Sequence, residues 1–138
     1  MRQPLLLDTC AMIWMAEDER LSDEAVLEID QASDRKESLV LSPISAWEIG
    51  MLASKGRFAS PMSPLAWLDR FAKGANVRLA PLAPEVLIAS SFLPGAPPKD
   101  PIDRIIIATA RHENLRLVTR DSAILAYGRA GHVSVVEC

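Results

Sequence analysis

The sequence predicts an α/β fold in which a central parallel sheet of about five strands is flanked by helices. Short apolar runs recur along the chain, segments with helical spacing separate them, and helix-capping residues precede several of these segments. Short apolar strands that alternate with helices are typical of a parallel sheet buried on both faces. The crossovers between such strands are expected to be right-handed.

The size and composition of the chain fit one globular domain, which we predict to span residues 1–138. Apolar residues make up 49% and charged residues 24%, which excludes a disordered chain. The net charge of −3 argues against a dominant basic surface for duplex nucleic acid. No apolar run approaches the ~20 residues that a membrane span needs. Asp8 interrupts the first apolar run, so we expect a cytoplasmic protein without a signal peptide.

The first part of the chain predicts two strands and the helices between them. Leu5–Leu7 is a strand, because this short apolar run ends in turn-forming polar residues. A short helix at 11–16 follows. Ser22 caps the next helix, because acidic residues occupy its first turn and residues with helical spacing continue to Ala32. Leu39–Leu41 is the second strand.

A serine followed by a proline marks the start of each of the next two helices. The pair at 42–43 opens a helix that ends near Gly56, and the pair at 63–64 opens one that continues to Phe71. Proline suits the first helical position, because its missing N–H would have no partner there. Val77–Leu79 is the third predicted strand.

The last part of the chain continues the alternation of helix and strand. A loop at 93–99 with three prolines separates two helices, and an Asp-Pro pair at 100–101 opens the second of them. The elements predicted here are a helix at 84–91, a helix from 102 to about 112, a strand at 115–118, a short helix at 121–127 and a strand at 133–136.

Four acidic residues stand at matching places in these units. Asp8 directly follows the first strand, and Asp121 lies just past the fourth. Glu48 is in the second turn of the helix after the second strand, and Asp103 is in the first turn of the helix that leads to the fourth. In an open parallel sheet, ligands bind beyond the carboxyl ends of the strands, near a switch in strand order. We therefore predict that the four carboxylates meet at one edge of the sheet.

A cluster of this kind implies a cation. Four carboxylates at one edge repel one another, so the cluster needs a bound cation or raised pKa values at neutral pH. Oxygen ligands without Cys or His point to Mg²⁺ or Mn²⁺. Each acid also has a purely structural interpretation. Asp8, Asp100 and Asp121 can cap helices, Asp103 can face a helix dipole, and Glu48 can be solvated.

Four segments of the chain resemble PIN-domain ribonucleases, and most closely the VapC-like toxins of type II toxin–antitoxin systems. In the family's order, the segments are LLLDTCAMIW at 5–14, SPISAWEIG at 42–50, DPIDRIIIATA at 100–110 and LVTRDSAIL at 117–125. The resemblance implies a three-layer PIN-like fold with an Mg²⁺ or Mn²⁺ site. The catalytic and metal-binding residues that it implies are Asp8, Glu48, Asp103 and Asp121. Thr9 and Thr119 would support this site, and Asp100 matches a frequent acid of the motif, for which we expect capping first.

These features predict a metal-dependent endoribonuclease. The ion would lower the pKa of a water molecule and stabilise charge on the phosphate, and a carboxylate would accept the proton. RNA products would then carry 5′-phosphate and 3′-hydroxyl ends. Many relatives have a lysine one helical turn after the motif glutamate, where this chain has Leu52. Basic residues beside the motifs are candidate RNA contacts, and they are Lys55, Arg57, Lys99, Arg104 and Arg120.

The resemblance also implies protein partners. A toxin of this type has an antitoxin that inserts a peptide near the site, and it forms a homodimer. Candidates for the apolar surfaces involved are Trp14, Trp47, Met51 and Trp67. Burial in the core is the alternative interpretation for all of them.

Other functions remain open at the level of sequence. A catalytically inactive RNA- or protein-binding module could share the fold, although the presence of all four acids argues against it. A receiver-type phosphoacceptor would have adjacent acids after the first strand, but Thr9 follows Asp8. Such a domain would also have an Asp after the third strand, and none follows Val77–Leu79. A haloacid-dehalogenase-type phosphatase would have a second Asp where this chain has Cys10.

Overall fold

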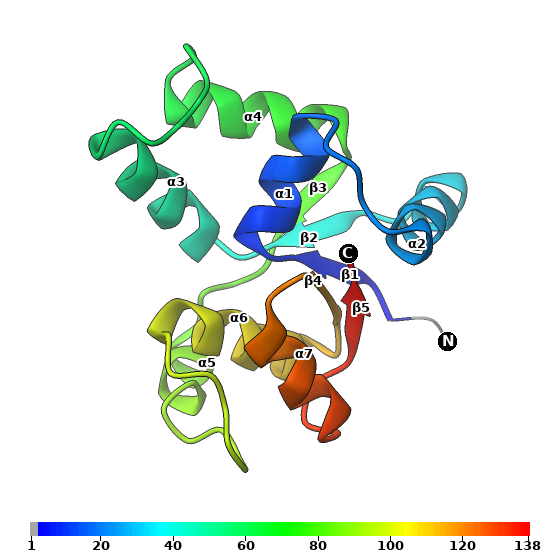
Figure 1. Ribbon diagram of the computed structural model, residues 1–138, viewed down its shortest axis with the longest axis vertical. Coiled ribbons are helices and arrows are strands. Elements are labelled where there is room, and N and C mark those ends of the chain that lie inside the picture. Colours follow the sequence, from blue (N-terminus) through cyan, green and yellow to red (C-terminus); the bar gives the residue numbers. More distant parts are fainter. Residues whose placement is uncertain (1–2) are drawn as a thin grey trace.

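The computed structural model describes residues 3–138 and shows the predicted alternation of strands and helices (Figure 1). The strands are β1 (Leu5–Leu7), β2 (Leu39–Leu41), β3 (Val77–Leu79), β4 (Arg116–Thr119) and β5 (Val135–Glu137). The helices are α1 (Thr9–Ala16), α2 (Asp23–Asp34), α3 (Ile44–Ser54), α4 (Pro64–Gly74), α5 (Pro84–Ala89), α6 (Pro101–Glu113) and α7 (Ser122–Arg129).

The strands form one parallel sheet of five, in the order β3-β2-β1-β4-β5. The chain leaves the central strand β1 towards β2 and β3, and then returns to place β4 and β5 on the other side of β1. The strand order therefore switches between β1 and β4, where Leu7 pairs with Val118. Side chains that follow these two strands face the crevice that forms at such a switch.

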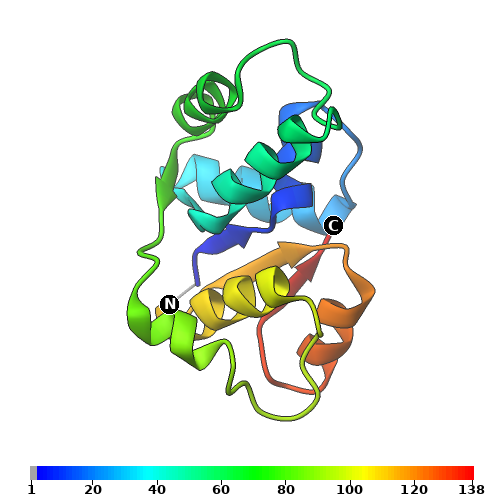
Figure 2. The same cartoon turned by 90° about the vertical axis from the view of Figure 1, so that its left-hand side faces the viewer.

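Helices cover both faces of the sheet, so the fold has the predicted three layers (Figure 2). Successive strand residues point to opposite faces, and each face has its own apolar core. Leu5 and Leu7 belong to the core that includes residues of α1, α2 and α4, whereas Leu6 belongs to the core that includes residues of α6 and α7. Leu6 has no solvent exposure, as expected for a strand at the centre of a sheet with both faces covered.

Aspartate and serine caps start most of the long helices, as predicted. Ser22 and Ser63 accept hydrogen bonds from backbone N–H groups in the first turns of α2 and α4. Asp8, Asp100 and Asp121 do the same for α1, α6 and α7. The capping interpretation of these three aspartates is therefore correct, and each keeps a second oxygen that can serve another purpose.

The prediction for the start of α3 was wrong in detail. Pro43 occupies the capping position itself rather than the first helical position, and it already has helical backbone angles. Ser42 lies one residue further back, where its hydroxyl accepts a hydrogen bond from the Ile44 N–H at 3.2 Å. Other differences are shifts of element ends. Helix α5 stops at Ala89, and β5 begins at Val135.

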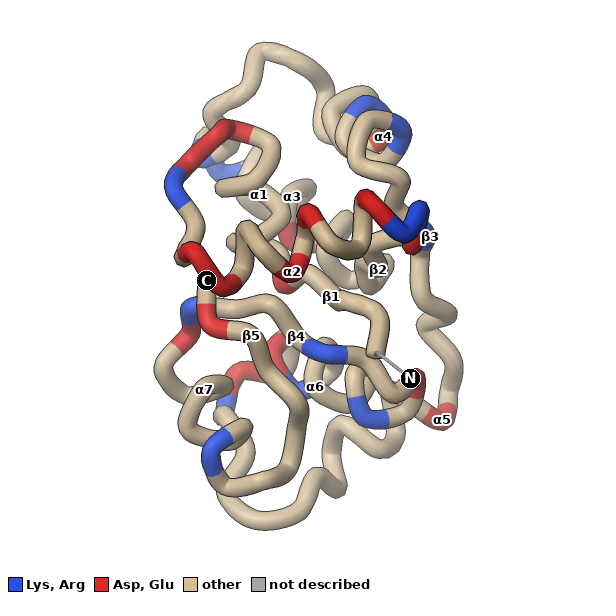
Figure 3. The backbone as a smooth tube through the Cα atoms, turned by 90° about the vertical axis from the view of Figure 1, so that its right-hand side faces the viewer, with Lys and Arg blue, Asp and Glu red and all other residues tan. Residues whose placement is uncertain are grey.

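No helix within residues 3–138 is long and apolar enough to cross a membrane. The charged residues are spread over several elements rather than forming one basic stripe on the face shown in Figure 3. Acidic residues gather along α2 and beyond the end of α1 on that face.

Candidate active site

A cavity of about 250 Å³ lies beyond the carboxyl ends of β1 and β4, and all four predicted acids line it. The strand ends supply Asp8 and Asp121, the second turn of α3 supplies Glu48, and the first turn of α6 supplies Asp103. The structure thus brings together residues that are far apart in the sequence, as predicted. The lining consists of Asp8, Thr9, Cys10, Trp14, Glu48, Asp103, Ile106, Arg120 and Asp121.

Asp8 is the most deeply buried of these acids, with 7% of its surface exposed. Its Oδ1 accepts from the Ala11 N–H at 2.7 Å, and its Oδ2 accepts from the Thr119 hydroxyl at 2.6 Å. Burial raises the pKa of Asp8, the two hydrogen bonds oppose this shift, and the charge of Asp121 adds to it. Thr119 Oγ1 also accepts from the Asp121 N–H at 3.1 Å, so this one hydroxyl links both acids.

Glu48 reaches the cavity from α3 and is held by Thr9. The Thr9 hydroxyl donates a short hydrogen bond to Glu48 Oε1, and its oxygen lies 2.9 Å from Ser45 Oγ. Burial raises the pKa of Glu48, and the hydrogen bond from Thr9 opposes this shift. The negative charges of Asp100 and Asp8 raise the pKa further.

Asp103 has a strongly raised pKa, and neighbouring carboxylates contribute to the shift. Burial raises its pKa from 3.8 to about 7, and the charges of Asp100, Asp121, Glu48 and Asp8 all contribute. Asp100 adds to this field while its own Oδ1 accepts from the Asp103 N–H at 3.1 Å. A carboxyl that is surrounded by other carboxylates holds its proton more tightly, which explains a pKa near neutrality.

The pKa of the Cys10 thiol also responds to the negative charge of the four acids. Burial raises its pKa to about 11, and the charges of the four cavity acids, Asp8, Glu48, Asp103 and Asp121, add to the shift in that order. The four carboxylates therefore act together on one point of the cavity wall. This electrostatic environment favours any cation that enters.

The donor set fits a hard divalent cation. Carboxylate oxygens are the ligands that Mg²⁺ and Mn²⁺ prefer. Within residues 3–138, no group of three or more Asp, Glu, His or Cys side chains already stands in a metal-holding arrangement. Asp8 already has both oxygens in hydrogen bonds. The charge of an ion bound among the carboxylates would offset the repulsion between them.

Arg120 borders the acids and is firmly anchored. Its guanidinium lies over the Trp14 ring, 4.0 Å from the ring centroid, in a cation–π contact. Its Nη2 donates to the backbone carbonyls of Arg20 at 3.0 Å and Cys138 at 2.9 Å. Arg120 is the basic residue of the predicted set that lines the cavity.

Two other predicted RNA contacts lie outside the cavity lining. Arg104 follows Asp103 on α6, but its Nε donates to the Pro98 carbonyl at 2.6 Å and so holds the proline-rich loop. Lys55 is exposed at the carboxyl end of α3. These positions make Arg104 and Lys55 weaker candidates for contact with a group bound among the acids.

The sequence interpretation missed Ser45, which is 1% exposed and completes the hydrogen bonds behind Glu48. Residues three apart on a helix share a face, so the spacing from Ser45 to Glu48 could have indicated it. It also missed that Trp14 forms part of the cavity wall under Arg120. No sequence pattern signals that contact, because Trp14 and Arg120 belong to different units of the fold.

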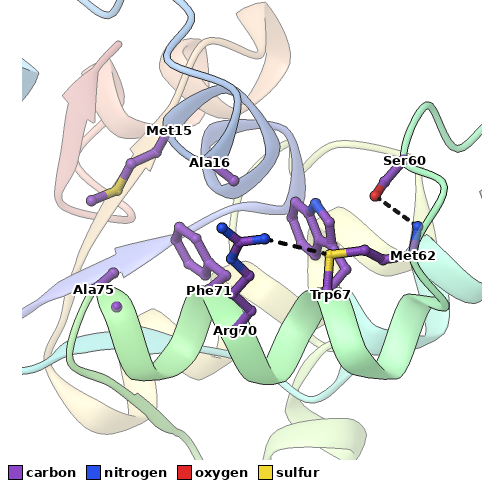
Figure 4. Close-up of a pocket in the computed structure, with 9 residues that line it drawn as sticks. Met15, Ala16, Ser60, Met62, Trp67, Arg70, Phe71 and Ala75 are labelled. Atoms are coloured by element: carbon purple, nitrogen blue, oxygen red, sulfur yellow. Dashed lines mark hydrogen bonds between the residues drawn. The ribbon is translucent and has the colours of Figure 1, made fainter.

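A second cavity, of about 500 Å³, lies between the end of α1 and α4 (Figure 4). Trp67 and Phe71 of α4 form an apolar wall, with stacked rings whose centroids are 6.0 Å apart. Arg70 points over the cavity towards Met62 (Figure 4). The cavity contains none of the four acids.

The tryptophans and Met51 divide between core and surface. Trp67 is buried in the core around α4, as the core interpretation holds. It also lines the cavity at α4, and only there does it offer an apolar surface. Trp47 and Met51 lie on α3 with 53% and 36% exposure, so the core interpretation was wrong for both. They are one helical turn apart, which places them on the same side of α3.

Comparison with known proteins identifies the family. The PIN domain family matches residues 5–130, a range that includes all four acids. Ribonuclease VapC22 from Mycobacterium tuberculosis is 35% identical over 132 residues, which cover 95% of this chain and 97% of that protein.

Two solved structures share the fold at lower identity. One is VapBC2 from Rickettsia felis bound to a promoter DNA fragment, with a TM-score of 0.67, 15% identity and coverage of 96% and 97% of the two chains. The other is a domain of a functionally unknown Methanocaldococcus jannaschii protein, with a TM-score of 0.60, 19% identity and coverage of 99% and 91%. The family match and the Mycobacterium relative extend over nearly the whole chain, and they confirm the resemblance predicted from the four segments. This chain belongs to the PIN-domain family.

Proposed function

We propose that this protein is a metal-dependent endoribonuclease of the VapC type and acts as the toxin of a toxin–antitoxin pair. The observation that carries the proposal is the convergence of Asp8, Glu48, Asp103 and Asp121 on one cavity at the switch between β1 and β4. The 35% identity to a protein named as a ribonuclease supports RNA as the substrate. Within this proposal, residues 1–138 act as one domain in the cytoplasm.

The four acids would have different roles in metal binding. Asp8 and Asp103 would hold one Mg²⁺ or Mn²⁺ directly, and Glu48 and Asp121 would hold it through water or hold a second ion with the substrate. When bound, the ion supplies an acidified water and positive charge at the phosphate. One of the carboxylates that line the cavity would accept the proton of the attacking water. Thr119 and Thr9 orient Asp8 and Glu48, respectively.

Arg120 is our first candidate for contact with the RNA backbone. Among residues 3–138, both of its hydrogen bonds come from Nη2, which leaves Nε and Nη1 to donate to a phosphate. The Trp14 ring and two carbonyls already hold the side chain, so little conformational entropy is lost on binding. Lys55 and Arg104 would act further out, by attracting the chain of phosphates. A strand-end cavity of this size suits a single-stranded or looped RNA better than a duplex.

The toxin role requires an antitoxin that covers the site, and the VapBC2 neighbour supports a partner of this kind. Trp14 lines the acid cavity and Met15 lines the apolar cavity at α4, so both cavities border α1. A single peptide running along α1 could therefore fill both. We also propose a homodimer, which would cover exposed apolar side chains such as Trp47 and Met51.

An RNA cleavage assay with defined oligonucleotides tests the enzymatic proposal. We expect cleavage of single-stranded or looped RNA in Mg²⁺ or Mn²⁺, none in EDTA, and products with 5′-phosphate and 3′-hydroxyl ends. RNA binding without cleavage in either metal would favour the inactive binding module. Transfer of phosphate from a small phosphodonor to Asp8 would favour the receiver domain. Growth arrest on expression, relieved by the neighbouring gene's product, tests the toxin role separately.

A further inference from the structure

The hydroxyl of Ser45 stands behind the predicted metal site without touching the cavity. Ser45 lies in the first turn of α3, and Glu48 follows it by three residues on the same face of the helix. Thr9, at the start of α1, bridges the two. Its Oγ1 lies 2.9 Å from Ser45 Oγ and donates to Glu48 Oε1.

The hydrogens in this chain of groups can be assigned by counting. A threonine hydroxyl has one hydrogen, and Thr9 gives it to Glu48. The hydrogen between Ser45 and Thr9 must therefore come from Ser45, with the Thr9 oxygen as acceptor. Among residues 3–138, the structure gives the Ser45 hydroxyl no other hydrogen-bond partner. Its single bond thus fixes the direction in which the Thr9 hydroxyl points.

The burial of these groups makes the arrangement rigid. Ser45 and Thr9 are 1% and 5% exposed, so water does not compete readily for their hydroxyls. Glu48 is only half-buried and would otherwise be free to turn towards solvent. With Oε1 held by Thr9, its Oε2 remains to face the cavity that the other acids line.

We propose that Ser45 is a positioning residue that acts on Glu48 through Thr9 and so strengthens divalent-ion binding in the cavity. This role rests on the proposed function, because it assumes that Glu48 helps to hold the ion. Groups that orient metal ligands commonly change metal affinity by about 10–100-fold when they are removed.

The chain offers a matched control for this role. Ser42 is also 1% exposed and also places its hydroxyl at the start of α3, where it accepts from the Ile44 N–H. Its hydroxyl has no bond to Thr9 or Glu48. Ser45→Ala and Ser42→Ala therefore remove the same atom from the same part of the fold, and only the first breaks the connection to Glu48.

Isothermal titration with Mn²⁺ alone, on the full chain, tests the proposal. We expect Ser45→Ala to weaken Mn²⁺ binding about 10-fold and Ser42→Ala to change it less than about 2-fold. In a Glu48→Gln background, Ser45→Ala should cause no further loss, because the residue through which it acts is already altered. Circular dichroism and thermal unfolding check that each variant is folded.

The outcomes separate this role from the function on which it rests. If Ser45→Ala binds Mn²⁺ with wild-type affinity, Ser45 has no positioning role. The same holds if Ser45→Ala weakens Mn²⁺ binding equally in the wild-type and Glu48→Gln backgrounds, because the loss would then not depend on Glu48. If Asp8→Asn loses Mn²⁺ binding while Ser45→Ala keeps it, the metal site stands and the positioning role fails. If the wild-type protein does not bind Mn²⁺, or if Asp8→Asn binds it equally well, both proposals fail together.

Discussion

Asp8→Asn should reduce kcat/KM for metal-dependent RNA cleavage by about 100-fold or more while leaving the fold intact. The amide removes a negative charge from the ion site. The structure explains why the fold should survive, because the amide oxygen can still accept from the Ala11 N–H and so cap α1. The amide N–H can donate to Thr119 Oγ1, so the two side chains remain hydrogen-bonded with donor and acceptor exchanged. Cleavage rates under saturating Mg²⁺ and Mn²⁺ measure the effect.

Asp69→Asn on the exposed face of α4 is the matched control for this prediction. It makes the same chemical change away from the cavity, and we expect its cleavage rate to stay within about twofold of the wild type. Equal activity of Asp8→Asn and the wild type would remove Asp8 from the reaction. A parallel loss of activity and of thermal stability in Asp8→Asn would reassign its role to folding.

Divalent ions should stabilise the folded protein, and this effect should grow with pH. An ion at about 100 times its Kd adds about 2.7 kcal/mol to the free energy of unfolding, which corresponds to a rise of roughly 10 °C in Tm for a chain of this size. The ion needs ionised carboxylates, and the pKa of Asp103 is raised to about 7. The rise in Tm should therefore be large at pH 8 and small at pH 5.

Without metal, the pH dependence should have the opposite direction. Asp103 holds its proton more tightly in the folded state, with a pKa of about 7, than in the unfolded chain, where the value is 3.8. The folded state thus binds more protons, and the free energy of unfolding should fall as pH rises from about 4 to about 7. Burial raises the pKa values of Asp8 and Glu48 in the same direction. Solvent screens the half-buried Asp103 and reduces the size of the effect.

Asp103→Asn checks the source of this pH dependence. In EDTA at pH 8, we expect this variant to have a higher Tm than the wild type, and the difference should shrink at pH 5. The same variant should gain less stability from Mn²⁺. A lower Tm for Asp103→Asn at pH 8 would mean that its charge favours the folded state, as a carboxylate beside a helix dipole would.

The fold was largely predictable because each unit carries its own local signal. The apolar triplets at β1 and β2 and the capping residues of α2, α4 and α6 are readable one segment at a time. The start of α3 was less predictable, because either Ser42 or Pro43 could occupy the capping position. The structure places Pro43 there. Exact strand ends depend on pairing with neighbours, as at β4 and β5, and no single segment encodes that pairing.

The site was predictable to the extent that strand ends determine it. Asp8 and Asp121 follow paired neighbouring strands, so the parallel topology alone brings them together. The support behind them could not be read in the same way. Ser45 contacts Thr9, and the Arg120 guanidinium lies over the Trp14 ring. Each contact joins helices or loops whose relative placement depends on the packing of the whole fold.

The most direct test of the shared ion site is a crystal of the wild-type protein grown with Mn²⁺ and measured at the manganese absorption edge. We predict one anomalous peak in the cavity, within about 2.1 Å of a carboxylate oxygen of both Asp8 and Asp103. Glu48 and Asp121 should lie within direct or water-mediated reach of the same peak. Manganese bound only at exposed acids such as those along α2, with none in the cavity, would contradict the account.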